Sequence, residues 1–277
     1  MHKHDKILIT GPKGLVGSAL VRCLENRGYT NLLTPTHSEL ELMDASAVAD
    51  YFKSKAPDHV FLAAAKVGGI LANSRYPADF IYRNLMIQNN VIHQAYVNNV
   101  KKLLFLGSSC IYPKHCPQPM KEEYLMTGSL EPSNSPYAVA KIAGIEMCWA
   151  YNRQHSTHFI PVMPTNLYGP NDNFDLETSH VLPALISKFH QAKQNHKSAV
   201  TVWGSGFPKR EFLYVDDLAD ACCFIMNREF SDFEYKNDPL FNIGTGKDIT
   251  IKELAGLIKN IIGYKGKIGR ASCRERV

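Results

Sequence analysis

The sequence predicts an α/β protein whose central sheet is parallel and doubly wound. Short apolar strands alternate with longer helical patterns from the N-terminus onward, and three spaced glycines follow the first strand directly. Alternation at this spacing is typical of βαβ units, which join parallel strands through a helix. With 277 residues, the chain is long enough for one large domain or two of modest size.

The first half of the chain carries the most regular alternation. Strands are predicted at residues 6–10, 31–36, 59–63, 102–107 and 158–162, and helices at residues 15–28, 45–55, 78–98 and 137–155. Residues 164–173, which include Gly169 and two prolines, indicate a break. Beyond the break the pattern is looser, with helices at 181–195, 217–227 and 250–262 and short strands near Thr201, near Phe212 and at 240–243.

The glycines after the first strand indicate a Rossmann-like dinucleotide site. Gly11 permits a tight turn, Gly14 lets the backbone approach a pyrophosphate, and Gly17 lets the helix pack closely on the strand. The N-terminus of the following helix attracts phosphate groups. The alternative is a glycine-rich turn in an unrelated α/β fold, because three glycines alone are a weak signal. The predicted cofactor contacts cover the whole loop: Gly11, Pro12, Lys13, Gly14, Leu15, Val16 and Gly17.

The end of the second predicted strand favours NADP(H) over NAD(H). Sites for NAD usually place an acidic residue there to hold the ribose diol. Here no acid stands before Glu39, whereas Lys13 and His37 could both meet a ribose phosphate. Ordinary solvated surface positions for Lys13 and His37 are the alternative.

A tyrosine and a lysine four residues apart predict proton transfer at an oxygen atom. Tyr137 and Lys141 lie on one face of a predicted helix, and a lysine cation lowers the energy of a neighbouring phenolate. Ser108, just after a predicted strand, can hold a substrate carbonyl beside that phenol. Cys110 is not needed for this chemistry, so its thiol suggests a second task, the removal of a proton from carbon.

Composition excludes several other classes of function. The net charge is +5, from 31 Lys and Arg against 26 Asp and Glu, and these charges are too scattered to predict nucleic-acid binding. The polar N-terminus leads straight into a strand, and no apolar run reaches the roughly 18 residues of a membrane span. The seven cysteines show no C-x-x-C pair, which predicts a reducing cytoplasm and neither a disulfide framework nor a zinc site.

Taken together, the motifs resemble those of the extended short-chain dehydrogenase/reductases. The match is closer to the NADPH-dependent epimerase-reductases that act on GDP-4-keto-6-deoxy-mannose, and it runs from Ile7 to about Lys267. The glycine and tyrosine-lysine motifs are common to the superfamily, whereas GSSCIYP at 107–113 and PTNLYGPNDNF at 164–174 are more specific. Further matching strings are AAAKVGGI at 63–70, YPADFIY at 76–82, YAVAKIAG at 137–144, VWGSG at 202–206 and REFLYVDD at 210–217.

The resemblance implies a two-stage reaction that yields GDP-L-fucose. The ketone at C4 of GDP-4-keto-6-deoxy-D-mannose acidifies the protons at C3 and C5, which are epimerised before hydride reduces C4. Cys110 is implied as the base and His180 as the acid. Ser108 and Tyr137 are implied to stabilise the enolate oxygen, and Lys141 to tune Tyr137 and hold the nicotinamide ribose.

The resemblance also implies binding contacts. Substrate contacts are implied for Lys188, Trp203 and Arg210. The family often has arginines where Lys13, His37 and Lys188 stand, which keeps positive charge but loses the bidentate guanidinium. Besides the glycine loop, cofactor contacts are implied for His37, Leu106, Gly107, Ser108, Ser109, Lys141, Pro164, Thr165, Asn166, Leu167 and His180.

Several alternatives stay open at this point. By itself, Cys110 is more typical of a small packed residue, and His180 of a surface or capping residue. Trp203 could belong to the core, and Arg210 could pair with Asp216. Competing functions are a nucleotide-sugar 4-epimerase, a dehydratase, or a non-catalytic protein that senses the dinucleotide.

The predicted domain organisation has three parts. Residues 1–165 form an NADP-binding domain, and residues 166–267 form a smaller α/β substrate domain that interleaves with the first. The resemblance implies that this second domain is truncated at its C-terminus. Residues 268–277 match one reading frame of a common sequencing adapter, show no strand or helix pattern, and are predicted to be non-native. Helices 78–98 and 137–155 are apolar on more than one face, which fits burial within a domain or a two-fold homodimer.

Overall fold

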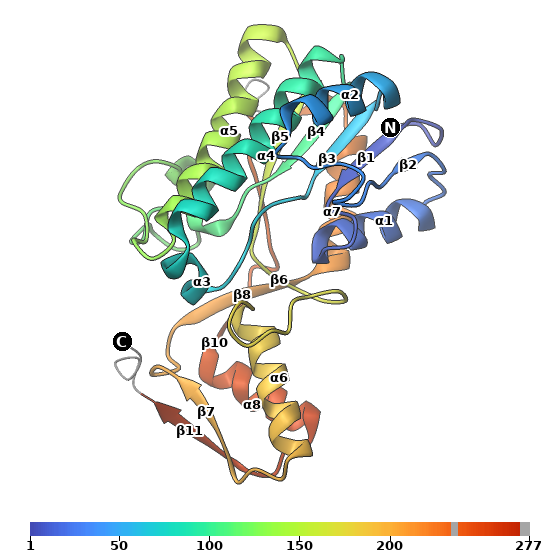
Figure 1. Cartoon of the computed structure of the whole chain (residues 1–277). Helices are drawn as coiled ribbons and strands as arrows, with labels where there is room; N and C mark the ends of the chain where they lie inside the picture. The colour runs from blue at the N-terminus through green and yellow to red at the C-terminus, as the bar shows by residue number, and fades with distance from the viewer. Residues whose placement is uncertain (234–237, 272–277) are drawn as a thin grey trace.

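A six-stranded parallel sheet forms the upper part of the molecule in the computed structural model (Figure 1). The structure describes residues 1–233 and 238–271. The strand order is β2-β1-β3-β4-β5-β9, with every neighbouring pair parallel. Because the order runs outward in both directions from β1 and β3, the sheet is doubly wound, and the predicted fold class is confirmed. Its strands are β1 (Ile7–Thr10), β2 (Leu32–Leu33), β3 (His59–Leu62), β4 (Lys102–Leu106), β5 (Phe159–Pro164) and β9 (Phe241–Ile243).

Helices cover both faces of this sheet. The pair α1 (Leu15–Asn26) and α7 (Val215–Asn227) lies on one face, and its apolar side chains join the sheet in one core. The opposite face carries α2 (Ala45–Lys55), α4 (Pro77–Val97) and α5 (Ser135–His155), which build a second core around Phe52, Ile92 and Ile145. All four residues of β1 are buried, as expected for a central strand with helices on both sides.

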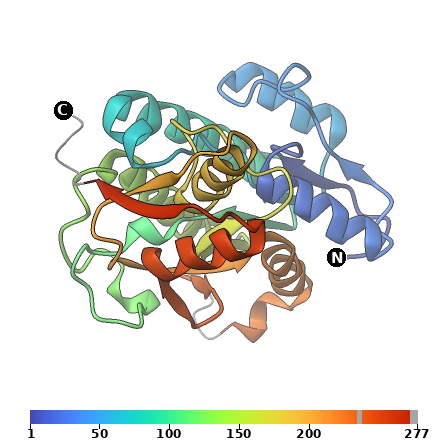
Figure 2. The ribbon, with the colours of Figure 1, turned by 90° about the horizontal axis from the view of Figure 1, so that it is seen from below.

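The lower part of the molecule is a small α/β unit (Figures 1 and 2). Here α6 (Val181–Gln194) packs against α8 (Ile251–Ile262) around a third core that includes Phe189 and Leu254. Two small sheets accompany these helices, in the orders β10-β8-β6 and β11-β7. Their strands are β6 (Asn166–Tyr168), β7 (Ala199–Trp203), β8 (Lys209–Tyr214), β10 (Asp248–Thr250) and β11 (Lys267–Ala271).

The chain passes between the two parts more than once. After β8 it returns to the upper part as α7, where Arg22 pairs with Asp216 and Arg27 with Asp220 across the contact with α1. It then adds β9 to the edge of the large sheet before descending to β10. The third core is therefore completed by residues far apart in the sequence.

Most predicted elements lie within a few residues of the observed ones, and the exceptions are short. The predicted strand at 31–36 is reduced to two residues, and the predicted break at 164–173 contains β6. The helix α3 (Ile70–Arg75) was not predicted, nor were β10 and three 3-10 helices at Ser109–Ile111, Glu122–Tyr124 and Phe230–Asp232. Such short elements span too few residues to show a hydrophobic period in the sequence.

One expectation about the C-terminal residues is wrong. Residues 268–271 were expected to show no strand, yet they pair with β7 in parallel as part of β11. Main-chain groups on the edge of β7 accept such pairing without any side-chain pattern. Residues 272–277 lie outside the described residues, and the non-native origin of the tail stays a prediction. Within the described ranges, no helix is long and apolar enough to cross a membrane.

Candidate active site

The glycine loop between β1 and α1 forms a cradle that admits no side chain at Gly11 or Gly17. Gly11 has a φ of +67°, a left-handed conformation that favours glycine. A Cβ at Gly17 would lie 2.0 Å from the main-chain oxygen of Gly11, which is impossible without moving the loop. Gly14 stands at the N-cap of α1, so the helix N-terminus opens directly onto the loop. This geometry fits a dinucleotide pyrophosphate.

Acidic side chains accompany both predicted phosphate-binding cations. Lys13 is exposed in the loop, and its charge lowers the pKa of Glu39, although the hydrogen bonds from Thr36 to Glu39 have the larger effect. His37 is exposed to 87% and lies 3.0 Å from Glu41, measured from Nε2 to the carboxylate. The Glu39 carboxylate is turned onto Thr36, 2.7 Å from its N–H. Lys13 and His37 are thus both exposed to solvent.

The predicted catalytic group gathers where β4 ends and α5 begins. The Cys110 Sγ donates to the Ser108 Oγ at 3.4 Å, within a 3-10 turn that follows β4. Lys141, one turn after Tyr137 on α5, is only 3% exposed. Its ammonium donates to the Leu106 carbonyl at 2.8 Å and lies 5.9 Å from the centre of the Tyr137 ring. The structure thus brings these four side chains together.

Burial dominates the electrostatics of this group. Desolvation raises the pKa of the Tyr137 phenol, and the Ser108 hydroxyl opposes that rise. Desolvation also raises the pKa of the Cys110 thiol, against the effects of Ser108 and of the Lys141 cation. The pKa of Lys141 is lowered to about 8, again by desolvation. At neutral pH the phenol therefore carries its proton, and the lysine stays charged.

The loop after β3 leads to Phe80 of α4, which contacts Tyr137 and which the sequence did not assign to the site. Thr10 fixes the start of this loop by accepting hydrogen bonds from Ala63 and Ala64 at 3.1 and 3.0 Å. Asn84 fixes its middle through two hydrogen bonds with the main chain of Lys66. Phe80 then stands edge-on to Tyr137, with ring centres 6.1 Å apart. The string AAAKVGGI at residues 63–70 was the one sequence feature that marked this loop, but the string alone did not indicate that the loop leads to a contact with Tyr137.

His180 is carried by the other part of the molecule, at the N-cap position of α6. Its side chain makes no capping hydrogen bond, so a purely capping role is excluded. The residue is exposed, as the surface alternative predicted, yet neighbouring protein lowers the pKa of the imidazole by desolvation, and the carboxylate of Asp172 opposes this. Desolvation in turn raises the pKa of Asp172. The position of Asp172 near His180 was not predicted from the sequence.

Residues 164–167 lie where the two parts meet. Pro164 ends β5, Thr165 donates its N–H to Ile243 at 3.1 Å, and Asn166 and Leu167 begin β6. The Thr165 hydroxyl is buried and has no hydrogen-bond partner among the described residues. The structure therefore places this segment at the carboxyl end of β5, the edge at which parallel α/β sheets bind ligands.

The predicted substrate contacts lie on the lower part. Lys188 of α6 places its ammonium 3.9 Å from the centre of the Trp203 ring. Trp203 is 42% exposed, so the alternative that it belongs to the core is wrong. Arg210 is exposed and donates to the Lys209 carbonyl, whereas Asp216 pairs with Arg22, so the alternative pairing of Arg210 with Asp216 is also wrong. Across the described part of the chain, no three His, Cys, Asp or Glu side chains gather as metal ligands.

A glycine cradle at β1 and a serine-tyrosine-lysine group at β4 define a dinucleotide-dependent enzyme of the doubly wound α/β class. The chain belongs to the NAD dependent epimerase/dehydratase family, whose model matches residues 7–244. It is 58% identical over 267 residues to GDP-L-fucose synthase 1 of Arabidopsis thaliana, covering 96% of this chain and 81% of that protein. It is 54% identical to the GDP-L-fucose synthase of Escherichia coli K12, covering 95% of this chain and 83% of the relative.

Solved structures agree with these likenesses. A GDP-6-OMe-4-keto-L-xylo-heptose reductase from C. jejuni superposes with a TM-score of 0.93 at 43% identity, covering 99% of this chain and 88% of that one. A GDP-L-fucose synthetase from Naegleria fowleri bound to NADP gives a TM-score of 0.88 at 31% identity, covering 98% and 82%.

Proposed function

We propose that this chain converts GDP-4-keto-6-deoxy-D-mannose to GDP-L-fucose, by epimerisation at C3 and C5 and NADPH-dependent reduction at C4. The observation that carries the proposal is the juxtaposition of a thiol with the serine-tyrosine-lysine group at the end of β4. Reduction alone requires no thiol. The names of the plant and bacterial relatives at 58% and 54% identity support the same reaction.

The residues present fit NADP(H) as the cofactor. Gly11, Gly14 and Gly17 would hold the pyrophosphate against the N-terminus of α1, where no Cβ obstructs it. Lys13 and His37 would meet the ribose phosphate. The NADP-bound relative from Naegleria fowleri supports this choice. When bound, NADPH supplies the hydride that reduces C4.

The proposed epimerisation is a pair of proton transfers. Cys110, as thiolate, takes the proton from a carbon next to the ketone. The C–H electron pair forms the C=C bond of the enolate, and the C=O π pair moves onto the ketone oxygen. Ser108 and Tyr137 stabilise that enolate oxygen by hydrogen bonding. His180, as imidazolium, returns a proton to the opposite face, which restores the ketone with inverted carbon. Burial makes the thiolate costly, and Lys141 is the cation that opposes this cost.

The proposed reduction uses the same oxygen site. Tyr137 retains its proton at neutral pH because burial raises its pKa, so it can give that proton to O4. Lys141 lies close enough to stabilise the phenolate that remains. Lys188, Trp203 and Arg210 would hold the GDP portion, with Arg210 suited to the diphosphate.

A direct assay tests the proposal. GDP-4-keto-6-deoxy-D-mannose and NADPH are added to the protein in deuterium oxide, and the NADPH absorbance and the sugar NMR spectrum are followed together. We expect NADPH oxidation with deuterium at C3 and C5. Cys110→Ser should lower deuterium incorporation at least 100-fold, whereas Cys116→Ser, a loop cysteine, should leave it unchanged.

Other results would replace the proposal. The likeness to the heptose reductase makes a GDP-4-keto-heptose the second candidate substrate. NADPH oxidation with that sugar, and none with the deoxymannose derivative, would favour reduction without epimerisation. NADPH binding without turnover of any 4-keto sugar would favour a dinucleotide-sensing protein.

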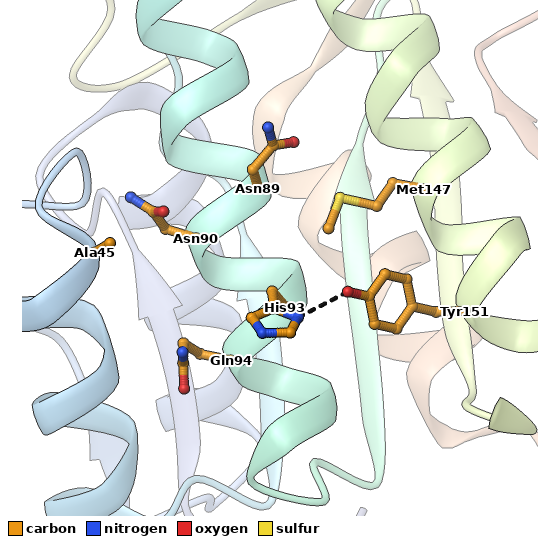
Figure 3. A pocket seen from close by; sticks show the side chains of 7 residues that line it. All are labelled: Ala45, Asn89, Asn90, His93, Gln94, Met147 and Tyr151. Carbon is orange, nitrogen blue, oxygen red and sulfur yellow. Dashed lines mark hydrogen bonds between the residues drawn. The ribbon is translucent and has the colours of Figure 1, made fainter.

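We also propose that the chain forms a homodimer through α4 and α5. A surface groove of about 420 Å³ lies between α2, α4 and α5 (Figure 3). At this groove His93 and Tyr151 join the two longer helices through a 2.8 Å hydrogen bond. Val97 and Val139, on the same two helices, are 51% and 44% exposed. The groove residues are Ala45, Asn89, Asn90, His93, Gln94, Met147 and Tyr151.

Light scattering after gel filtration tests the dimer. We expect twice the mass of one chain, and a single chain for Met147→Asp, because a buried charge at a two-fold contact is repeated on both partners. The same substitution at Met126, an exposed residue elsewhere, is the control. A single-chain mass for the unaltered protein would reject the dimer.

We further propose a cytoplasmic location, because the six described cysteines are all free thiols.

A further inference from the structure

We propose that Gly69 is a positioning residue that sets the place of His180. The inference rests on the proposed function, because it concerns the acid of the epimerisation. Gly68 and Gly69 end the loop after β3, with Gly69 at the N-cap of α3, whereas His180 is the N-cap of α6 in the other part of the molecule. This glycine pair is the place where the loop after β3 meets the residues that precede His180.

Gly69 makes a main-chain contact too close for any side chain. Its N–H donates to the Thr178 carbonyl at 2.9 Å. A Cβ at Gly69 would lie 2.6 Å from the main-chain oxygen of Ser179, the residue next to His180. The φ and ψ of Gly69 are −66° and 178°, which any residue adopts. Glycine is therefore required here by the contact and not by the backbone conformation.

Two buried asparagine side chains fix the main chain at and before the glycine pair. Asn73 donates from Nδ2 to the carbonyls of Gly68 and Gly69 at 2.8 and 3.1 Å. The Asn84 side chain accepts a hydrogen bond from the N–H of Lys66 and donates one to the Lys66 carbonyl, just before the glycine pair. Both asparagines are more than nine-tenths buried. Because these hydrogen bonds hold the glycine pair in place, an added Cβ at Gly69 would displace the facing segment, residues 175–179.

The facing segment, residues 175–179, leads directly to His180. The Asp175 carboxylate accepts hydrogen bonds from the N–H groups of Glu177 and Thr178, at 3.1 and 2.9 Å, and the Asp175 carbonyl accepts one from Ser179 at 2.9 Å. His180 follows at once, and its carbonyl accepts the first hydrogen bond of α6 from Ala184. A shift of Ser179 is therefore carried to the imidazole rather than absorbed by a loose segment.

Gly68, the other residue of the glycine pair, faces Phe80, which contacts the proposed proton donor Tyr137. A Cβ at Gly68 would lie 3.1 Å from Phe80, the ring that stands edge-on to Tyr137. A Cβ at Gly68 would thus meet mainly the side chains of Ala72 and Phe80, with the Thr178 carbonyl farther away at 3.7 Å, whereas a Cβ at Gly69 would meet only main-chain atoms of Thr178 and Ser179. The two neighbouring glycines should consequently affect different stages of the reaction.

The test compares Gly69→Ala with Gly256→Ala. Gly256 lies in α8 with open space around the position of a Cβ, so the same chemical change is harmless there. For Gly69→Ala we expect deuterium incorporation at C3 and C5 to fall roughly tenfold to 100-fold, as for a misplacement of about 1 Å. NADPH affinity and the rate of C4 reduction of an already epimerised 4-keto sugar should stay within about twofold. Gly69→Val should lower incorporation further.

A second readout does not depend on turnover. The imidazole proton resonance of His180, assigned by its loss in His180→Asn, should shift in Gly69→Ala and stay in place in Gly256→Ala. An unshifted resonance, or equal losses in epimerisation and reduction, would overturn the positioning role. A shifted resonance in a protein that acts on neither sugar would uphold the role of Gly69 while rejecting the proposed function.

Discussion

Lys141 donates a hydrogen bond from its ammonium to the carbonyl of Leu106, 2.8 Å away at the carboxyl end of β4. The bond joins α5 to the central sheet directly beside the turn that carries Ser108 and Cys110. It fixes a positive charge inside the protein, where the lysine is almost fully covered. This hydrogen bond therefore helps to place the Lys141 cation near both the Tyr137 phenol and the Cys110 thiol.

The first prediction concerns the pH dependence of the reduction. Burial lowers the pKa of Lys141 to about 8, so its cation is present below that pH and is lost above it. Since the cation stabilises the phenolate of Tyr137, kcat/KM for NADPH-dependent reduction should fall tenfold per pH unit above about 8. Lys141→Met should lower kcat roughly 100-fold at pH 7 and abolish this alkaline fall. A rate profile of the unaltered enzyme that stays level to pH 10 would contradict the assignment.

The second prediction concerns the glycine cradle. Gly17→Ala would place a Cβ 2.0 Å from the Gly11 carbonyl, and overpacking of this kind costs about 1–3 kcal/mol. We expect a lower melting temperature and at least a tenfold loss of NADPH affinity, measured by fluorescence titration. Gly256→Ala, with no neighbour for its Cβ, should change neither quantity. Unchanged affinity in Gly17→Ala would show that the dinucleotide binds elsewhere.

The sheet and its main helices could be predicted from the sequence because their signals are local. The helix α2 was predicted at its observed bounds, and the glycine loop lies between a strand and a helix as its spacing indicated. Tyr137 and Lys141 share a helix face by simple periodicity. Predicting that Tyr137 and Lys141 lie near Cys110 needed only the further assumption that β4 and α5 are neighbours in the fold.

What could not be predicted depends on contacts between distant segments. Asp172 lies near His180, and Gly69 contacts Thr178, through loops with no period of their own. The strand β11 was missed because its pairing with β7 is made by the main chain. The role of a residue in such contacts is determined by the partner that the fold supplies, which a single sequence does not indicate.

The third prediction concerns the choice of cofactor. Lys13→Ala should weaken NADPH binding several-fold and leave NADH binding within about twofold, because only NADPH carries the ribose phosphate. The loss should shrink as salt is added, as expected for an exposed charge. Lys53→Ala, an exposed lysine on α2, is the control for net charge. Equal weakening of both dinucleotides would instead assign Lys13 to the pyrophosphate.

The fourth prediction concerns the acid of the epimerisation. Asp172 raises the pKa of His180 against the larger lowering by burial, so Asp172→Asn should reduce the protonated fraction of His180 at pH 7. Relative to the unaltered enzyme at the same pH, deuterium incorporation at C3 and C5 should be several-fold lower at pH 7 and should approach equality as the pH is lowered. Glu177→Gln changes an exposed charge on the same loop and should have little effect. A loss in Asp172→Asn that is the same at every pH would indicate a structural role for Asp172.

The fifth prediction concerns acid stability at the other end of the sheet. His59, at the start of β3, is buried and lies 3.0 Å from Asp5, measured from Nε2 to the carboxylate. Burial lowers the pKa of His59 from 6.5 to about 4, despite the hydrogen bond to Asp5. The unfolded chain therefore binds more protons than the folded one between these pH values, so the stability that depends on neutral His59 is complete above pH 6.5 and lost toward pH 4.

The size of that loss follows from the shift. About 2.5 pKa units correspond to roughly 3 kcal/mol, at about 1.4 kcal/mol for each unit. We expect the free energy of unfolding, measured by urea titration, to fall by this order between pH 6.5 and 4. His59→Gln, which can keep the hydrogen bond to Asp5 without titrating, should remove most of that slope, whereas His115→Gln at an exposed loop position should not. If His59→Gln kept the full slope, the acid sensitivity between pH 6.5 and 4 would have to come from titratable groups other than His59 and Asp5. Desolvation raises the pKa of Asp5, but the hydrogen bonds from His2 and His59 outweigh it and lower that pKa to about 2, so its own contribution would be lost only below pH 3.8.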